Sequence, residues 1–196
     1  MKRLIQQMLI YGVMICLNLS CGQADDPDQN HLNSELTMDS RRFTFPFSGP
    51  ADAKYTEAPR SFGSCRSNCT RLHAAADLYG LIGRPIYAVG AGSVIDFHYF
   101  YDGTYALVVN HGDFIVRYGE IGQSLPQGIA VGSQVRAGQL IAYVGDLISL
   151  NQSMLHFERF SGKATGPLTV RDNPPYQRRS DLENPTADLI AWPYPL

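Results

Sequence analysis

Three side chains that can bind a metal ion stand in two short stretches of the sequence, residues 71–80 and 154–158. His73 and Asp77 are four positions apart, and His156 follows about eighty residues later. Residues at this spacing can point the same way on a helix or on an extended strand. Two imidazoles and a carboxylate suit Zn²⁺, and three protein ligands leave the fourth tetrahedral position open, as in catalytic zinc sites. The pattern therefore indicates a zinc site.

Each stretch also has an ordinary interpretation. A His and an Asp four residues apart are common in solvated turns, where they form a local hydrogen bond. His156 lies in an apolar run, where a half-buried histidine bonded to the backbone is the default. The zinc interpretation therefore depends on the sequence between the two stretches.

The elements in that sequence read as strands and tight turns. Alternating or continuous apolar runs predict strands, and glycines separate them at a spacing that leaves no room for a long helix. We expect strands at 85–89, 93–101, 105–109 and 114–121, short strands at 131–135 and 139–144, a strand-like start at 43–47 broken by prolines, and a short helix within 182–190. The predicted fold class is all-β, mostly antiparallel sheet, with an irregular N-terminal segment and at most short helices.

The N-terminal forty residues are typical of an exported protein. A basic start and a short apolar run predict a signal peptide at residues 1–20, too short and too polar for a membrane-spanning helix. Residues 17–22 resemble a bacterial lipobox with Cys21 as the lipidated residue, although Asn18 stands where an aliphatic residue is usual. An ordinary cleaved signal peptide is the alternative. Residues 21–40 are polar and acidic, which predicts a flexible tether that holds the following domain near a membrane of the cell envelope.

Export bears on the remaining cysteines. Cys65 and Cys69 are an even pair in an oxidising compartment, so we expect a local disulfide. A second metal site is the weaker alternative, because no further ligands cluster around the two thiols.

Length and charge limit the function classes. About 175 residues remain after the signal peptide, enough for one domain, which we place at residues 41–196. The net charge is −2 and the pI is about 6.2, so nothing indicates a nucleic-acid partner. We expect a monomer.

Five ordered motifs resemble those of the lysostaphin/LytM-type zinc endopeptidases of bacterial peptidoglycan. They are His73-x-x-x-Asp77, Gly-Arg-Pro-Ile-Tyr-Ala-Val at 83–89, Val-Val-Asn-His-Gly at 108–112, Gly-Ser-Gln-Val-Arg-Ala-Gly-Gln at 132–139 and Leu-His-Phe-Glu at 155–158. The resemblance covers residues 60–189. It implies a compact β domain with zinc in a groove on one sheet face, His73, Asp77 and His156 as ligands, and hydrolysis of peptidoglycan stem or bridge peptides.

The sequence departs from the family pattern at two histidines that members usually carry. Glu120 and Met154 stand at these positions, and the chain resembles a variant branch with this exchange. Ala75 also replaces a usual glycine, whereas His111 corresponds to a common turn histidine. We regard His111, His98 and His31 as structural or surface residues.

Two hypotheses follow. The first is an exported, envelope-located zinc endopeptidase in which Glu120 is the general base, Tyr118 is an oxyanion donor and Met154 lines the groove. This role of Tyr118 assumes that it shares a strand face with Glu120, two residues on. The second is an inactive zinc-containing domain that binds murein or regulates another hydrolase. In either case Glu120 can instead be a solvated strand-end carboxylate or a partner of a ligand histidine.

Overall fold

A computed structural model describes residues 42–196 of the protein. The predicted signal peptide, Cys21, the tether and His31 lie outside the described residues. Within residues 42–196, no helix has the length and apolar character needed to cross a membrane.

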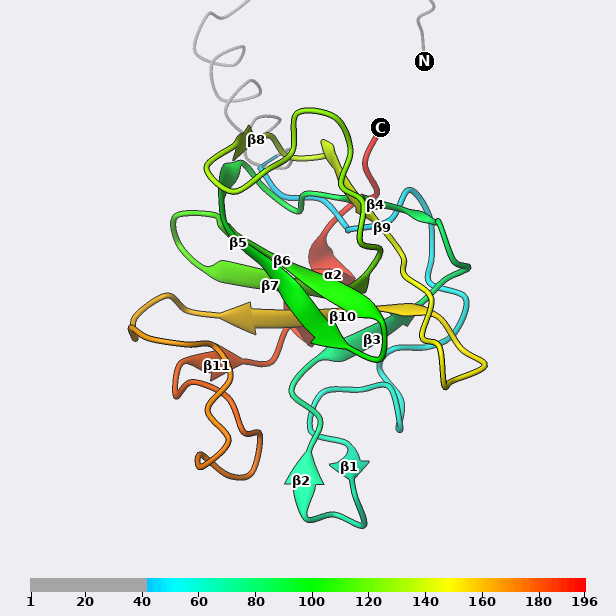
Figure 1. Cartoon of the computed structure of the whole chain (residues 1–196), viewed down its shortest axis with the longest axis vertical. Helices are drawn as coiled ribbons and strands as arrows, with labels where there is room; N and C mark the ends of the chain where they lie inside the picture. Colours follow the sequence, from blue (N-terminus) through cyan, green and yellow to red (C-terminus); the bar gives the residue numbers. More distant parts are fainter. Residues whose placement is uncertain (1–41) are drawn as a thin grey trace, which may run out of the picture.

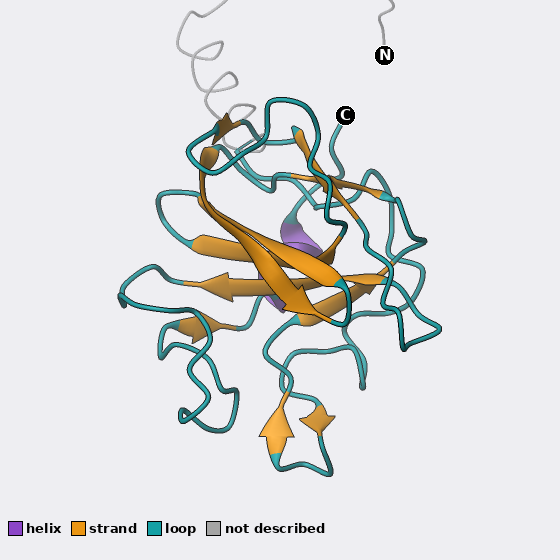
Figure 2. Cartoon of the chain, viewed as in Figure 1, coloured by secondary structure: helices purple, strands orange, loops and turns teal. Residues whose placement is uncertain are grey.

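One antiparallel sheet of seven strands dominates the domain (Figures 1 and 2). Six strands follow the order β11-β10-β7-β6-β5-β8, and β3 pairs with β10 on the side opposite β7, beyond the end of β11. Their bounds are β3 Ala76–Tyr79, β5 Gly92–Tyr101, β6 Thr104–Asn110, β7 Ile115–Ile121, β8 Gln134–Val135, β10 Met154–Phe160 and β11 Leu182–Glu183. The prediction of a mostly antiparallel all-β fold of the lysostaphin/LytM kind is therefore confirmed.

Two small sheets and one helix complete the fold. Strands β1 (Cys65–Arg66) and β2 (Arg71–Leu72) form a hairpin that projects from the main sheet, at the bottom of Figure 1. Strands β4 (Pro85–Tyr87) and β9 (Leu140–Tyr143) pair with each other, and α2 spans Thr186–Ala191. The helix is shorter than predicted, because β11 takes the first residues of the predicted range and Pro185 stands at the helix N-cap.

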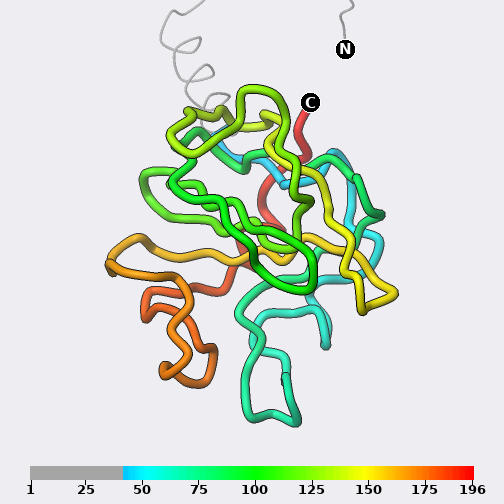
Figure 3. The backbone as a smooth tube through the Cα atoms, in the orientation of Figure 1, coloured from blue at the N-terminus to red at the C-terminus, as the bar shows by residue number. Residues whose placement is uncertain are grey.

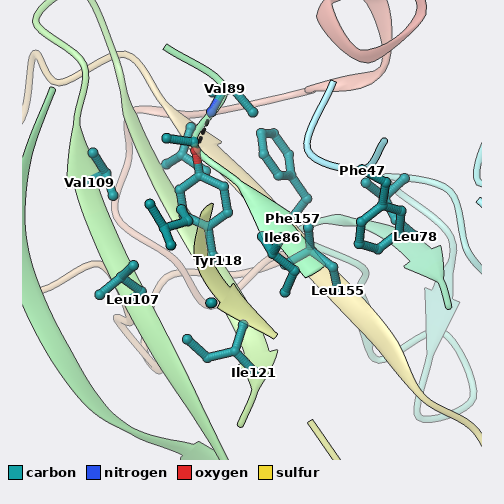
Figure 4. Close-up of a cluster of buried hydrophobic side chains, with 14 of the residues drawn as sticks. Phe47, Leu78, Ile86, Val89, Leu107, Val109, Tyr118, Ile121, Leu155 and Phe157 are labelled. Atoms are coloured by element: carbon teal, nitrogen blue, oxygen red, sulfur yellow. Dashed lines mark hydrogen bonds between the residues drawn. The ribbon is translucent and has the colours of Figure 1, made fainter. Parts of the chain in front are cut away.

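The hydrophobic core lies on one face of the main sheet. Leu155 and Phe157 of β10 and Tyr118 of β7 are fully buried there, as Figure 4 shows. Phe45 and Phe47 are both buried in this core, although residues 43–47 form no strand. Pro46 lies between them and lacks a backbone N–H, so it cannot donate to a strand ladder.

Strand β10 positions the groups of chemical interest. Because side chains alternate along a strand, Met154, His156 and Glu158 point away from the core that receives Leu155 and Phe157. β10 pairs with β3 on one side and with β7 on the other, so His156 lies opposite both Asp77 and Gly119. The backbone trace in Figure 3 shows how β3 and β10, far apart in the sequence, run side by side.

Candidate metal centre and substrate groove

The structure brings together the three predicted ligands. Asp77 of β3 faces His156 of β10 across the strand ladder, and His73 lies just before β3. His73 Nε2 is 3.0 Å from Asp77 Oδ1, His156 Nδ1 is 2.8 Å from the same oxygen, and the two nitrogens are 3.3 Å apart. All three residues are buried. Two ligand atoms on one tetrahedral zinc ion lie about 3.4 Å apart, so small movements of these side chains would accommodate the ion.

Hydrogen bonds at the outer side of each ring favour the tautomer that a metal needs. His73 Nδ1 lies 3.0 Å from the carbonyl oxygen of Ser61, so Nδ1–H donates there and Nε2 presents its lone pair to the cluster. His156 Nε2 lies 3.0 Å from Glu158 Oε1, so Nε2–H donates to this carboxylate and Nδ1 faces Asp77. Histidine ligands of metals usually have such outer partners. These three residues therefore fit a zinc ion.

The electrostatics of the cluster also favour a cation. Burial alone lowers the pKa of His156, but hydrogen bonds to Asp77 and Glu158 outweigh burial and raise this pKa to about 9. Burial likewise opposes ionisation of Asp77, yet the two imidazoles hold its pKa below the usual value. Asp77 and Glu158 thus favour a positive charge at His156, in the place where the three ligands would hold a cation.

Glu158 is itself held by two arginines that we did not predict. Arg117 Nε and Arg178 Nε donate to its two carboxylate oxygens, each at 2.9 Å. Glu158 is fully buried, and these arginines keep its pKa below the usual value despite burial. Strand alternation places Glu158 on the same face as His156. The two arginines stand in motifs that resemble the variant branch of the family, but the sequence did not assign them a contact with Glu158, because they come from β7 and from the segment between β10 and β11.

Glu120 lies at the groove for a reason other than strand alternation. The pairing of β6 with β7 shifts register between Tyr105 and Leu107, so that β7 contains an extra residue, and Glu120 has a φ of 61°. The Glu120 carbonyl accepts a hydrogen bond from the N–H of Gly145 at 2.9 Å, and a Cβ at position 145 would lie 2.9 Å from the same oxygen. This bulge brings the Glu120 side chain to the groove that His156 also lines. One of its oxygens, Oε2, is buried without a hydrogen-bond partner among the described residues, and burial raises the pKa of Glu120 to about 7.

The expectation that Tyr118 lies beside Glu120 is wrong. Tyr118 is fully buried in the core, where its hydroxyl accepts a hydrogen bond from the N–H of Val89 at 3.0 Å (Figure 4). His111 Nε2 lies 3.1 Å from the same hydroxyl. The bulge after Tyr118 breaks the alternation on which the prediction rested, so the Tyr118 hydroxyl has no access to the groove.

The metal candidates lie on the floor of a groove of about 980 Å³. Met154 and Glu120 contribute to its lining, and the Tyr99–Tyr101 end of β5 contributes aromatic side chains. A disulfide joins Cys65 to Cys69 in the β1–β2 hairpin, which supplies one wall. Its lining includes the imidazoles of His73 and His156 and the carboxylates of Asp77 and Glu120.

The sequence itself carries a family relationship that agrees with this geometry. Residues 71–167 match the model of peptidase family M23, a range that contains His73, Asp77, Glu120, Met154 and His156. The chain belongs to peptidase family M23. The match ends before Arg178, so the arginine that supports Glu158 lies beyond the matched M23 region.

Solved structures share the fold of the M23 domain. The antimicrobial peptidase lysostaphin from Staphylococcus simulans is 18% identical, with a TM-score of 0.59 over 79% of this chain and 56% of that chain. LytU is 23% identical, with a TM-score of 0.54 over 75% of this chain and 95% of that chain. The protein named cbpa from L. salivarius REN is 18% identical, with a TM-score of 0.53 over 76% and 95% of the respective chains. Among curated proteins, none matches the sequence significantly.

Proposed function

We propose that this M23 domain is a zinc-dependent endopeptidase that hydrolyses peptide bonds in bacterial peptidoglycan. The observation that carries the proposal is the arrangement of His73 Nε2, Asp77 Oδ1 and His156 Nδ1, within 3.3 Å of one another on a groove floor. The description of lysostaphin as an antimicrobial peptidase supports the substrate class.

In this proposal His73, Asp77 and His156 hold zinc. Zinc supplies Lewis acidity, which polarises the scissile carbonyl and lowers the pKa of a water molecule toward about 7. Ser61 and Glu158 hold the two imidazoles in the ligating tautomer, and the arginines on Glu158 keep that carboxylate ionised.

Glu120 is the proposed general base. Its carboxylate is buried beside His156 and has one oxygen free of hydrogen bonds within residues 42–196, so it can accept a proton from water. Met154 has no group that accepts or donates a proton in this role. With Tyr118 in the core, no tyrosine at that position assists the reaction.

The second candidate function is an inactive zinc-containing domain that binds murein or regulates another hydrolase. It is favoured because Glu120 and Met154 replace the two histidines that family members usually carry. Tyr118 does not compensate for this replacement, since its hydroxyl lies in the core.

Metal analysis and murein digestion test the proposal together. Purified residues 41–196 should contain about one zinc per chain, and His156→Ala should lose it. The wild-type protein should release soluble fragments from purified murein, and mass spectrometry of these fragments identifies the bond cut. Zinc retained in His156→Ala would refute the ligand set. A zinc-loaded protein that cuts no murein would instead support the binding or regulatory function.

The proposed location is the bacterial cell envelope, with the mature chain anchored to a membrane by lipid on Cys21. The intact mass of the mature native protein reports this directly, because acylation adds a hydrocarbon mass to a chain that begins at Cys21.

A further inference from the structure

Two arginines face each other on the β1–β2 hairpin at the groove wall. Arg66 of β1 is the direct cross-strand partner of Arg71 of β2, and both side chains line the groove. Like charges directly opposite each other destabilise a strand pair. A two-residue ladder gains little stability from its hydrogen bonds, so this pairing needs another explanation.

Of the other arginines that line the groove, Arg66 and Arg178 have acidic partners, whereas Arg171 is exposed. Arg66 donates to Asp77 Oδ2 at 3.0 Å, and Arg178 donates to Glu158 Oε1 at 2.9 Å. Arg71 differs, because no hydrogen bond or ion pair of its guanidinium occurs within residues 42–196. The side chain is half-buried at the groove. Arginine stays protonated in proteins, so Arg71 brings a positive charge to the groove without an ion-pair partner among residues 42–196.

Neighbouring contacts hold the backbone around Arg71. The Cys65–Cys69 disulfide closes the hairpin, and the N–H of Leu72 donates to the carbonyl of Pro175 at 2.9 Å. Phe62 and Tyr176 stack at 4.8 Å between centroids and join the same two segments. A half-buried arginine on a hairpin held in this way is better suited to ligand recognition than one on a mobile loop, because less backbone freedom is lost on binding.

We propose that Arg71, flanked by Arg66 and Arg178, forms a subsite of the groove that binds a carboxylate group of the peptide substrate. The proposal rests on the proposed function, in that it names the substrate as an anionic peptide. A guanidinium presents paired N–H donors that match the two oxygens of a carboxylate. Arg66 and Arg178 form ion pairs with Asp77 and Glu158, so Arg71 makes the direct contact with the substrate carboxylate. The charges of Arg66 and Arg178 add to the positive electrostatic potential around it.

A pair of peptides that differ only in charge tests this subsite. The probes are a cross-linked murein stem peptide with free carboxyl groups and the same peptide with these groups converted to carboxamides. Calorimetry on the metal-free protein measures binding without cleavage, and KM and kcat on the zinc-loaded protein measure turnover. The wild-type protein should bind the carboxylate peptide about tenfold or more tightly than the amide peptide. Arg71→Gln should bind the two peptides equally, with the change in KM rather than in kcat.

Two further variants keep the test specific. Arg71→Lys should retain part of the preference, because it keeps the charge but loses the paired donors. Arg136→Gln removes the same charge from an exposed position outside the groove and should behave as wild type. The wild-type preference should also weaken as sodium chloride is raised, which requires no variant.

The outcomes separate this inference from the proposed function. Cleavage of murein with no preference for the carboxylate peptide, or a preference that Arg71→Gln retains, would overturn the subsite and leave the peptidase intact. Preferential binding that requires Arg71, in a zinc-loaded protein that cuts neither peptide, would support the subsite and count against peptidase activity.

Discussion

The two ring nitrogens of His156 make different contacts, one with the other candidate ligands and one with Glu158. Nδ1 faces His73 and Asp77, whereas Nε2–H donates to Glu158. Glu120 has no such fixed task, since one of its oxygens is buried without a partner within residues 42–196. An unpaired buried carboxylate oxygen costs free energy, so its retention is easier to understand if the oxygen receives a proton or a ligand during function.

Replacing Glu120 by Gln separates a basic role from a structural one. Because Gln keeps the size but cannot accept a proton, Glu120→Gln should reduce murein turnover about 10²- to 10⁴-fold while zinc content stays unchanged. Glu57→Gln, at an exposed position, is the matched control and should keep wild-type turnover. Turnover of Glu120→Gln within a few-fold of wild type would exclude Glu120 as the base.

Two irregular elements shape the groove around the regular sheet. The bulge in β7 delivers Glu120 to the groove while Tyr118 and Ile121, on either side of it, remain in the core. The disulfide-closed β1–β2 hairpin carries Arg66 and Arg71 along the groove wall. Such a hairpin has too few ladder bonds to be stable alone, so the covalent link and the contacts with residues 175 and 176 hold it in place.

Removing the disulfide should therefore affect both stability and recognition. By the chain-entropy model, a disulfide that closes so short a loop stabilises the folded protein by about 2 kcal/mol. The free energy of unfolding of the Cys65→Ser/Cys69→Ser double variant should fall by this amount, and its urea midpoint should be lower. Its preference for the carboxylate peptide should also fall, because Arg71 is less well positioned. Reductant should destabilise the wild-type protein and leave the double variant unchanged. Equal unfolding midpoints of the two proteins would show that the disulfide does not stabilise the hairpin.

At the scale of the whole molecule, a buried relay of hydrogen bonds ties the loops above the sheet to its core. Val89 N–H donates to the Tyr118 hydroxyl, and His111 Nδ1 lies 3.1 Å from the carbonyl oxygen of Ala91. With Nδ1–H donating to Ala91, His111 Nε2 accepts from the Tyr118 hydroxyl. The relay needs a neutral imidazole, and burial lowers the pKa of His111 to about 4.

This depressed pKa predicts a loss of stability in acid. The unfolded chain binds a proton at His111 near pH 6.5, whereas the folded protein does so only near pH 4, so the free energy of unfolding falls as the pH drops through this window. Between pH 7 and pH 5 the fall due to His111 should be about 2 kcal/mol. Urea unfolding of the metal-free protein, compared with His111→Gln, isolates this contribution. An identical pH dependence in the two proteins would contradict the prediction.

The sequence by itself determined the fold class, the three candidate ligands and the cysteine pair, because these depend on local patterns. Strand alternation and glycine turns predicted the β elements, and the period of two placed Met154, His156 and Glu158 on one face of a strand, which is β10 in the structure. The same rule misplaced Tyr118, since a one-residue bulge reverses the face of every following side chain and leaves no clear mark in the sequence. Only the tertiary structure decided which distant residues meet: Ser61 with His73, Arg117 and Arg178 with Glu158, and Arg66 with Arg71 at the groove. These contacts depend on strand register and loop packing, which short-range patterns do not specify.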